Sequence, residues 1–251
     1  MTLLAVLITL ATGAVMGAVN NLAGGAGALG LLAFEYACGL PIATANPSMR
    51  LAALSIGIFA YLGYARAGQR VPRRVWILGA LALPGAPLGS WLALHVPPLA
   101  FWTYLSLVLL ALILQQVRRP ALAPGPARPF WQAMIACFLI GMHMGYAQVG
   151  MGLLTTLVLA ATYDRDLVAT AAAKSVIVIV TSAASLATFS AAEAISWGPA
   201  LWLSLGTGIG SFWISRWAVS RGTRAVRIVV LAVAGFTLAY AVRHAILAAG
   251  A

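Results

Sequence analysis

Residues 167–189 have the sequence LVATAAAKSVIVIVTSAASLATF, and this stretch decides the fold class of the chain. An α-helix of that length crosses the roughly 30 Å hydrocarbon core of a bilayer. Apolar runs of similar length recur along all 251 residues, which are 63% hydrophobic and only 8% charged. A soluble domain of this composition would expose too much apolar surface to water. The sequence therefore predicts an all-α polytopic membrane protein.

Lys174 lies inside this stretch and is the only lysine of the chain. Arg50 has a similar place, early in an apolar run of the first half. An ionisable group at membrane depth costs several kcal/mol, so it is treated as a functional site. Because the chain has 15 basic residues and only 4 acidic ones, these two cations predict the handling of an anion. For Arg50, a side chain that reaches the lipid headgroups is the alternative.

The other arginines indicate the topology. Most lie in three short connectors: Arg66/Arg70/Arg73/Arg74, Arg118/Arg119/Arg128 and Arg216/Arg221/Arg224/Arg227. Short basic connectors are typically cytoplasmic and meet anionic headgroups, so the formal charge of +11 does not indicate nucleic acid. Full spans are then expected at 43–65, 75–95, 99–117, 167–189, 197–217 and 226–242, with both termini outside.

Two further apolar segments, 1–40 and 130–163, are too long for one straight span and short for two. Both contain glycines near the middle, and we interpret each as a re-entrant or short helical hairpin. Such breaks are tolerated where the loose backbone lines a polar cavity.

The two halves repeat. GAPLGSW at 85–91 corresponds to GTGIGSF at 206–212, and ATA occurs at 43–45 and 169–171. The connector after 43–65 is basic and hence inside, whereas its counterpart after 167–189 is neutral and hence outside. We expect two inverted-topology repeats, each a broken or re-entrant hairpin plus three transmembrane helices, at 1–117 and 129–251 with a cytoplasmic linker at 118–128. The ATA match and the pairing of Arg50 with Lys174 differ by two residues in register, which the sequence leaves open. Folds of this kind bind substrate near the midplane at discontinuous helices.

The glycine-containing breaks are the first candidate site. NNLAGGAG at 20–27 and YAQVGMG at 146–152 combine amides with glycines, whose backbone N–H groups can point at an anion. Close packing of helices is the alternative role for such glycines. The candidate residues are Asn20, Asn21, Gly24, Gly25, Gly27, Gln148, Gly150 and Gly152.

The sequence NPSMR at 46–50 is the second candidate. Asn46 as N-cap and Pro47 as first helical residue predict a helix start there, from which Arg50 would offer bidentate hydrogen bonds to a sulfonate or carboxylate. His143, with Tyr146 close by, is a candidate proton relay, and it could equally be a packing histidine.

These features together resemble the sulfite exporter TauE/SafE family over nearly the whole chain: the glycine-rich break, the ANPSMR helix start, the G-x-x-x-G third span and the repetition of this plan after a proline-rich linker. The resemblance implies a permease for sulfite, organosulfonate or related anions in the bacterial inner membrane. It carries the family's glycine-rich loops to Gly24, Gly25, Gly27, Gly150 and Gly152, and its polar helix starts to Asn46, Ser48, Arg50, Lys174 and Ser175. The second half departs from the fuller glycine run, which leaves the identity of the ligand open.

We therefore expect a secondary transporter, an exporter, that works by alternating access around a central cationic site. Its expected partners are a small anion and the lipid bilayer, with a homodimer left open, and no nucleic acid. No cofactor, metal or catalytic residue is expected, because the chain lacks a Walker motif, a G-x-S-x-G sequence and a membrane His/Asp pair. An anion channel and a permease for small carboxylates remain the alternatives. Direction, coupling ion and the anion itself are not fixed by the sequence.

Overall fold

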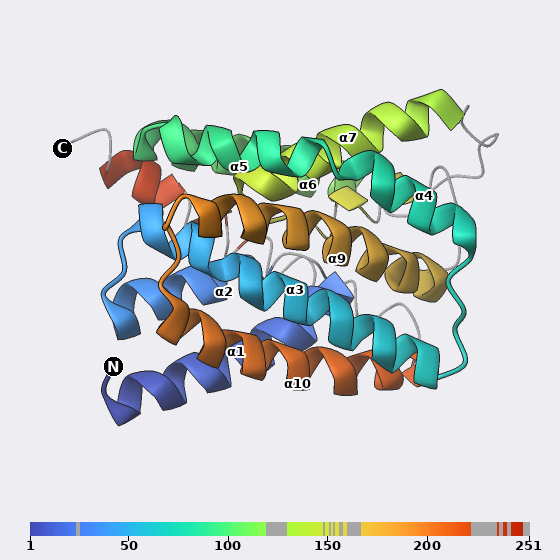
Figure 1. The fold of residues 1–251 in the computed structure, drawn as a ribbon, viewed down its shortest axis with the longest axis horizontal. Helices are drawn as coiled ribbons and strands as arrows, with labels where there is room; N and C mark the ends of the chain where they lie inside the picture. The colour runs from blue at the N-terminus through green and yellow to red at the C-terminus, as the bar shows by residue number, and fades with distance from the viewer. Residues whose placement is uncertain are drawn as a thin grey trace.

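The computed structural model describes residues 1–23, 26–118, 130–147, 149–150, 152, 154–155, 158–159, 167–221, 235, 238–239 and 242–247. Within these residues the chain forms helices and turns without a strand (Figure 1). The helices are α1 (Leu3–Ala23), α2 (Gly27–Leu32), the π-helix η1 (Ala33–Ala37), α3 (Ile42–Arg66), α4 (Arg73–Ala82), α5 (Gly85–His95), α6 (Pro98–Arg118), α7 (Phe130–Tyr146), α9 (Leu167–Ala191) and α10 (Trp197–Arg221).

Four stretches of the described chain are long and apolar enough to cross a membrane: Leu3–Asn21, Ile42–Arg66, Arg73–His95 and Val168–Ala191. They confirm the prediction of a polytopic α-helical membrane protein. The expected span at 226–242 and the linker that follows Arg118 lie mostly outside the described residues.

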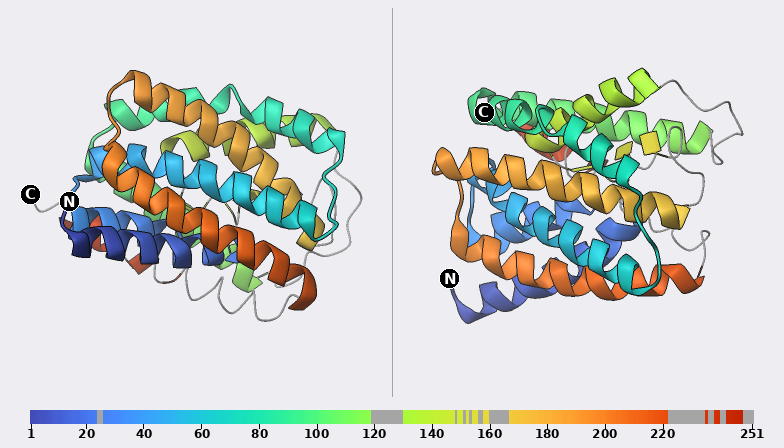
Figure 2. Two further views of the ribbon diagram at one scale, coloured as in Figure 1. Left: turned by 60° about the horizontal axis from the view of Figure 1, so that its bottom comes forward. Right: turned by 45° about the vertical axis from the view of Figure 1, so that its right-hand side comes forward.

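The helices α3 and α9 lie side by side and run in opposite directions (Figures 1 and 2). As a result, the basic connector after α3 and the neutral connector after α9 lie at opposite ends of the molecule. They are in close contact at Gly57, where an added Cβ would lie 3.0 Å from the Ile179 backbone nitrogen.

The predicted helix start at Asn46 is wrong. Helix α3 already begins at Ile42, after the N-cap Pro41, and Pro47 lies inside it. The stop and start signals are Gly39, with φ of 66°, and Pro41. The Leu40 amide donates to the Phe34 carbonyl, which closes the preceding helix as a left-handed glycine typically does.

The expected span at 75–95 is confirmed by the stretch Arg73–His95, which contains a turn at Leu83 and Pro84 between α4 and α5; a proline cannot donate to the carbonyl four residues earlier. The first helix of the chain differs from expectation. Helix α1 has 21 residues, so the first arm of the 1–40 segment is longer than a short hairpin arm. The break in that segment does fall between Ala23 and Gly27, as the glycines predict.

Glycines bring α5 and α7 into backbone contact. A Cβ at Gly85 or Gly89 of α5 would overlap backbone atoms of α7, and a Cβ at Gly141 or Gly145 of α7 would overlap the carbonyls of Ala82 and Ala86. The Ser90 hydroxyl also donates to the Gly145 carbonyl, over 3.4 Å. Contact this close is possible only because these four positions lack side chains.

Helices α10 and α1 pack in the same way. A Cβ at Gly206 or Gly210 would overlap α1, and a Cβ at Gly13 or Gly17 would overlap the Leu203 and Thr207 carbonyls. Here the Ser211 hydroxyl donates to the Gly17 carbonyl, over 3.1 Å. Each of these contacts has a counterpart in the α5–α7 pair.

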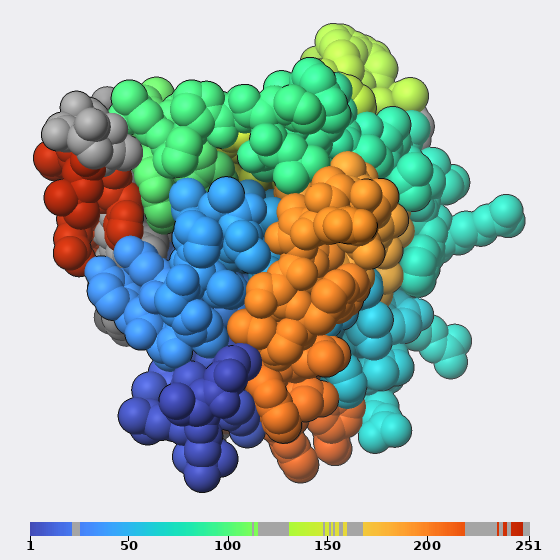
Figure 3. Space-filling view, turned by 60° about the vertical axis from the view of Figure 1, so that its left-hand side comes forward, coloured from blue at the N-terminus to red at the C-terminus, as the bar shows by residue number. Residues whose placement is uncertain are grey.

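The end of the molecule at which α3 starts gathers several segments (Figure 3). The N-terminal part of α1, the η1–α3 turn, the α9–α10 connector and the helical residues 242–247 all lie there. Glu35 of η1 approaches His244 at 3.4 Å, and the His244 ring stacks on Trp102 of α6 at 4.6 Å between centroids. These contacts attach residues 242–247 to η1 and to α6.

Candidate functional site

Arg50 is fully buried and holds the end of α7. Its guanidinium donates to the carbonyls of Met144, Gly145 and Tyr146, at 2.7, 3.0 and 3.2 Å. These are the last residues of α7, whose carbonyls have no partner within the helix and form the negative end of its dipole. The Phe189 ring covers the guanidinium at 5.2 Å from its centroid. Arg50 therefore does not reach the lipid headgroups, and its charge compensates a helix end inside the protein.

Asn46 supports this arrangement from within α3. Its side-chain oxygen accepts a hydrogen bond from Arg50 at 2.9 Å, and its side-chain NH2 group donates to the Tyr146 backbone carbonyl at 2.9 Å. Asn46 is thus a bridge between Arg50 and α7 rather than a helix cap.

Lys174 holds the end of α1 in the first half, as Arg50 holds the end of α7. Lys174 is 5% exposed, and its ammonium group donates to the backbone carbonyl of Asn21 at 2.9 Å. Asn21 lies in the last turn of α1, directly before the break. Each buried cation therefore reaches from its own half to the end of the first helix of the other half.

The Asn21 side chain ties the same turn to two more helices. Its amide donates to the Ser215 hydroxyl and to the Ser211 carbonyl of α10, and its oxygen accepts from the Tyr64 hydroxyl of α3 at 3.3 Å. Asn21 is 1% exposed. The amide that the sequence offered as an anion ligand is occupied by protein groups in this conformation, while the neighbouring Asn20 is buried at 8%.

The two breaks meet in the structure. A Cβ at Gly27, the first residue of α2, would lie 3.0 Å from the Val149 side chain. Val149 and Gly150 form the turn that follows α7, and Gly150 has φ of 82°, which favours glycine. Gly152 is buried just beyond this turn. The candidates Gly24, Gly25 and Gln148 lie outside the described residues.

His143 fixes this turn. Its Nε2–H donates to the Val149 carbonyl at 3.1 Å, since a carbonyl only accepts, and its Nδ1 then accepts from the Tyr104 hydroxyl at 2.8 Å. The Tyr146 ring lies edge-on to Tyr104, with centroids 4.9 Å apart. The two relay candidates are therefore neighbours, joined by Tyr104.

Two predicted residues make other contacts. The Ser48 hydroxyl donates to the Thr44 carbonyl and accepts from the Ser196 amide at 2.8 Å, so it attaches α3 to the α9–α10 connector. The Ser175 hydroxyl donates to the Ala172 carbonyl of its own helix.

Arg50 and Lys174 do not lie together. Each lies near the start of its helix, and α3 and α9 are antiparallel. The contact of Gly57 with Ile179 lies between them, which separates the two residues by roughly 18 Å along the helix axes at 1.5 Å per residue.

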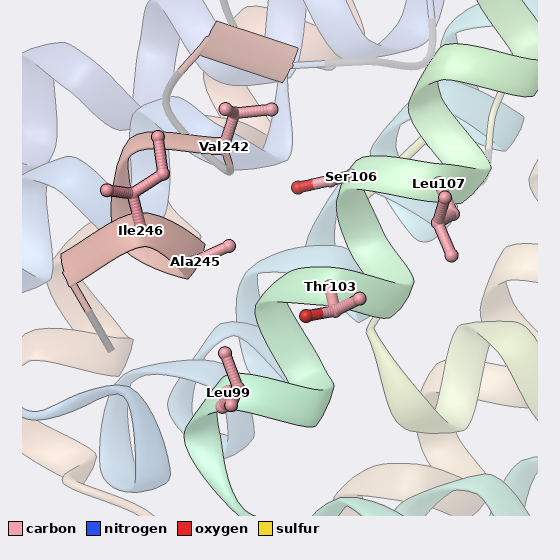
Figure 4. Close-up of a pocket in the computed structure, with 7 residues that line it drawn as sticks. All are labelled: Leu99, Thr103, Ser106, Leu107, Val242, Ala245 and Ile246. Carbon is pink, nitrogen blue, oxygen red and sulfur yellow. The ribbon is translucent and has the colours of Figure 1, made fainter. Parts of the chain in front are cut away.

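An open groove of about 300 Å³ lies elsewhere, between α6 and residues 242–247 (Figure 4). Its described lining consists of Leu99, Thr103, Ser106, Leu107, Val242, Ala245 and Ile246. None of these residues carries a charge that would bind an anion.

The sequence model of one family, Sulfite exporter TauE/SafE, matches residues 9–241. The chain belongs to the sulfite exporter TauE/SafE family. The match spans both breaks, both buried cations and both glycine-packed helix pairs, and it confirms the resemblance seen in the sequence. Membrane transport of sulfite or a related anion is the activity that this family implies. Comparison with curated proteins and with solved structures finds no match.

Several residues of this TauE/SafE protein's candidate site were missed in the sequence. Tyr64, Tyr104 and the α10 residues Ser211 and Ser215 were not singled out, yet they contact Asn21 or His143. A signal existed in α10, where the buried polar residues Ser204, Thr207, Ser211 and Ser215 recur every three or four positions. That spacing marks one face of a helix turned to the protein interior.

Proposed function

We propose that this protein is a secondary transporter that exports sulfite, an organosulfonate or a related small anion across the bacterial inner membrane. The family match gives the broad activity. The observation that carries the finer proposal is Lys174, a buried ammonium group on the Asn21 carbonyl beside the first break. A cation at that place offers an entering anion a charge-assisted hydrogen bond in a region of low dielectric.

The proposed anion site lies where the two breaks meet. Gly27 and Val149 bring the first and second breaks into contact, and Asn21 with Lys174 lies at the end of the adjoining helix α1. Backbone N–H groups of the glycine-containing turns, with Asn20 and Gln148, would complete the donors in this proposal. An anion that loses its hydration there is compensated by hydrogen bonds worth about 1.5–3 kcal/mol each.

Alternating access would use two inverted repeats, at 1–117 and 129–251. Matched contacts support this proposal: Gly85 and Gly89 meet α7 as Gly206 and Gly210 meet α1, at corresponding carbonyls. The antiparallel course of α3 and α9, each with its cation in the first half of the helix, agrees with the same relation. In such a fold, rocking of one half against the other exposes the central site to each side in turn.

Flux measurements on reconstituted protein test the proposal. Proteoliposomes should show saturable flux of sulfite, thiosulfate or sulfoacetate, and a gradient of the coupling ion should drive accumulation of that anion against its own gradient. Acetate, with one charge and no sulfur oxyanion group, should compete at least tenfold less well. Equal competition by acetate would favour the carboxylate permease instead.

An anion channel is the second candidate, because the same buried cations could line a pore. The discriminating observation is concentrative uptake. Flux that only dissipates gradients and does not saturate would replace the transporter with a channel.

A further inference from the structure

Two buried cations with similar places in their halves make different sets of contacts. Arg50 donates to three carbonyls of α7 and to the Asn46 side chain. Among the residues that the structure describes, Lys174 makes one hydrogen bond, to the Asn21 carbonyl, although an ammonium group has three donors.

From this difference we infer that the two cations have different roles in transport. Lys174 binds the anion and releases the Asn21 carbonyl to do so, while Arg50 is a positioning residue that stays bound to the end of α7. The inference rests on the proposed function. It names which cation meets the substrate and which half of the protein responds to it.

The exchange at Lys174 is favourable on simple grounds. Only one neutral acceptor has to be replaced, and an anion is a stronger acceptor for an ammonium group than a carbonyl is. Lysine also suits the exchange, because its charge sits on a flexible four-carbon stem. Arg50 has neither property: its planar guanidinium fits several carbonyls at once, and an anion would have to displace all of them. The Phe189 ring also covers it.

The exchange has a consequence for α1. The Asn21 carbonyl lies in the last turn of α1, and this helix end loses its compensating charge when Lys174 turns to the anion. The corresponding end of α7 keeps its compensating charge, because the Arg50 guanidinium remains bound to its carbonyls. Substrate binding should therefore loosen the first break and leave the second one as it was.

The matched variants are Lys174→Met, Lys174→Arg and Arg50→Lys in the full-length protein. For Lys174→Met we expect a 10- to 100-fold loss of sulfite affinity and a fall in the unfolding temperature without ligand, because the buried Asn21 carbonyl loses the Lys174 donor. Lys174→Arg keeps the charge and should recover affinity to within several-fold of the wild type. Arg50→Lys keeps the charge but cannot span three carbonyls, so its unfolding temperature and maximal transport rate should fall while sulfite affinity stays within a few-fold.

Hydrogen exchange gives a local measurement that does not depend on the Arg50 variant folding. In the wild-type protein, sulfite should raise amide exchange in peptides that cover 17–23 and leave 140–147 unchanged. Lys174→Met should raise exchange at 17–23 without any ligand.

Four outcomes separate the possibilities. If the wild-type protein binds sulfite and Lys174→Met binds it equally well, this inference and the proposed site at Lys174 are wrong, while the proposed transport of sulfite stands. It is also wrong if Arg50→Lys folds and loses affinity as Lys174→Met does, or if sulfite changes both helix ends alike. A wild-type protein that binds none of sulfite, thiosulfate and sulfoacetate would overturn the proposed function, and the anion exchange with it.

Discussion

Arg50 and Lys174 show what a helix break inside a membrane protein requires of single residues. A helix that ends in the interior leaves carbonyls without donors, and no water is at hand to satisfy them. Here the donors are side chains from the opposite half, placed on the ends of α7 and α1. A cation in such a place has two roles open to it, since it can stabilise the break or respond to an anion.

At the residue scale, replacing His143 by Gln should be mild. A glutamine amide can still donate to the Val149 carbonyl, which is the bond that holds the turn after α7. We expect most sulfite binding to remain, with a change at most in the pH dependence of transport. His143→Ala should cost more, about 1–3 kcal/mol, because it leaves the Val149 carbonyl and the Tyr104 hydroxyl without this partner. Sulfite titration and thermal unfolding of both variants test this; complete loss of binding in the glutamine variant would make His143 a ligand.

Gly150 provides a second test at this scale. Its φ of 82° lies where a side chain costs roughly 1–2 kcal/mol, so Gly150→Ala should lower the unfolding temperature. Gly198→Ala is the matched control, because Gly198 has ordinary backbone angles and its added Cβ would meet only the Met1 sulfur, at 4.0 Å. Equal unfolding temperatures for the two variants would show that the Gly150 turn is not strained by a side chain.

At the scale of elements, the two glycine-packed pairs should respond alike. Gly145→Ala pushes a methyl group into the Ala86 carbonyl, and Gly17→Ala does the same to the Thr207 carbonyl. Each should destabilise the protein by about 1–3 kcal/mol, because overpacked helices must move apart. Gly235→Ala is the control, since no atom of the described residues lies within 4 Å of its added Cβ. Unfolding in detergent measures all three, and a response in only one of the pairs would speak against the repeat relation.

The helices also show how much of the fold could be predicted from the sequence. The spans of α3 and α9 followed from apolar length, and the break after Ala23 followed from its glycines. The predicted helix start at Asn46 was wrong, because the sequence NP is typical of a helix start. Nothing in the local sequence shows that Asn46 instead binds the Tyr146 carbonyl, 100 residues away. The partners of Arg50 and Lys174 could not be predicted for the same reason. Lys174 and Asn21 are 153 residues apart, and only the packing of the two halves brings them together.

For the whole molecule, the antiparallel course of α3 and α9 makes a prediction about sidedness. Gln69 lies in the basic connector after α3, and Ala192 lies in the connector after α9, at the other end of the structure. Basic connectors stay in the cytoplasm, so a cysteine at 69 should be labelled from inside and a cysteine at 192 from outside.

The labelling experiment needs a background without native thiols. The chain has two cysteines, of which Cys137 is buried and Cys38 partly so. With both replaced by serine or alanine, a membrane-impermeant maleimide added to intact cells should modify Ala192→Cys and spare Gln69→Cys until the cells are opened. The two variants serve as controls for each other, because they differ only in which connector carries the thiol. Labelling of both positions from the same side would place the two connectors together, and the inverted repeats, with the alternating access built on them, would have to be given up.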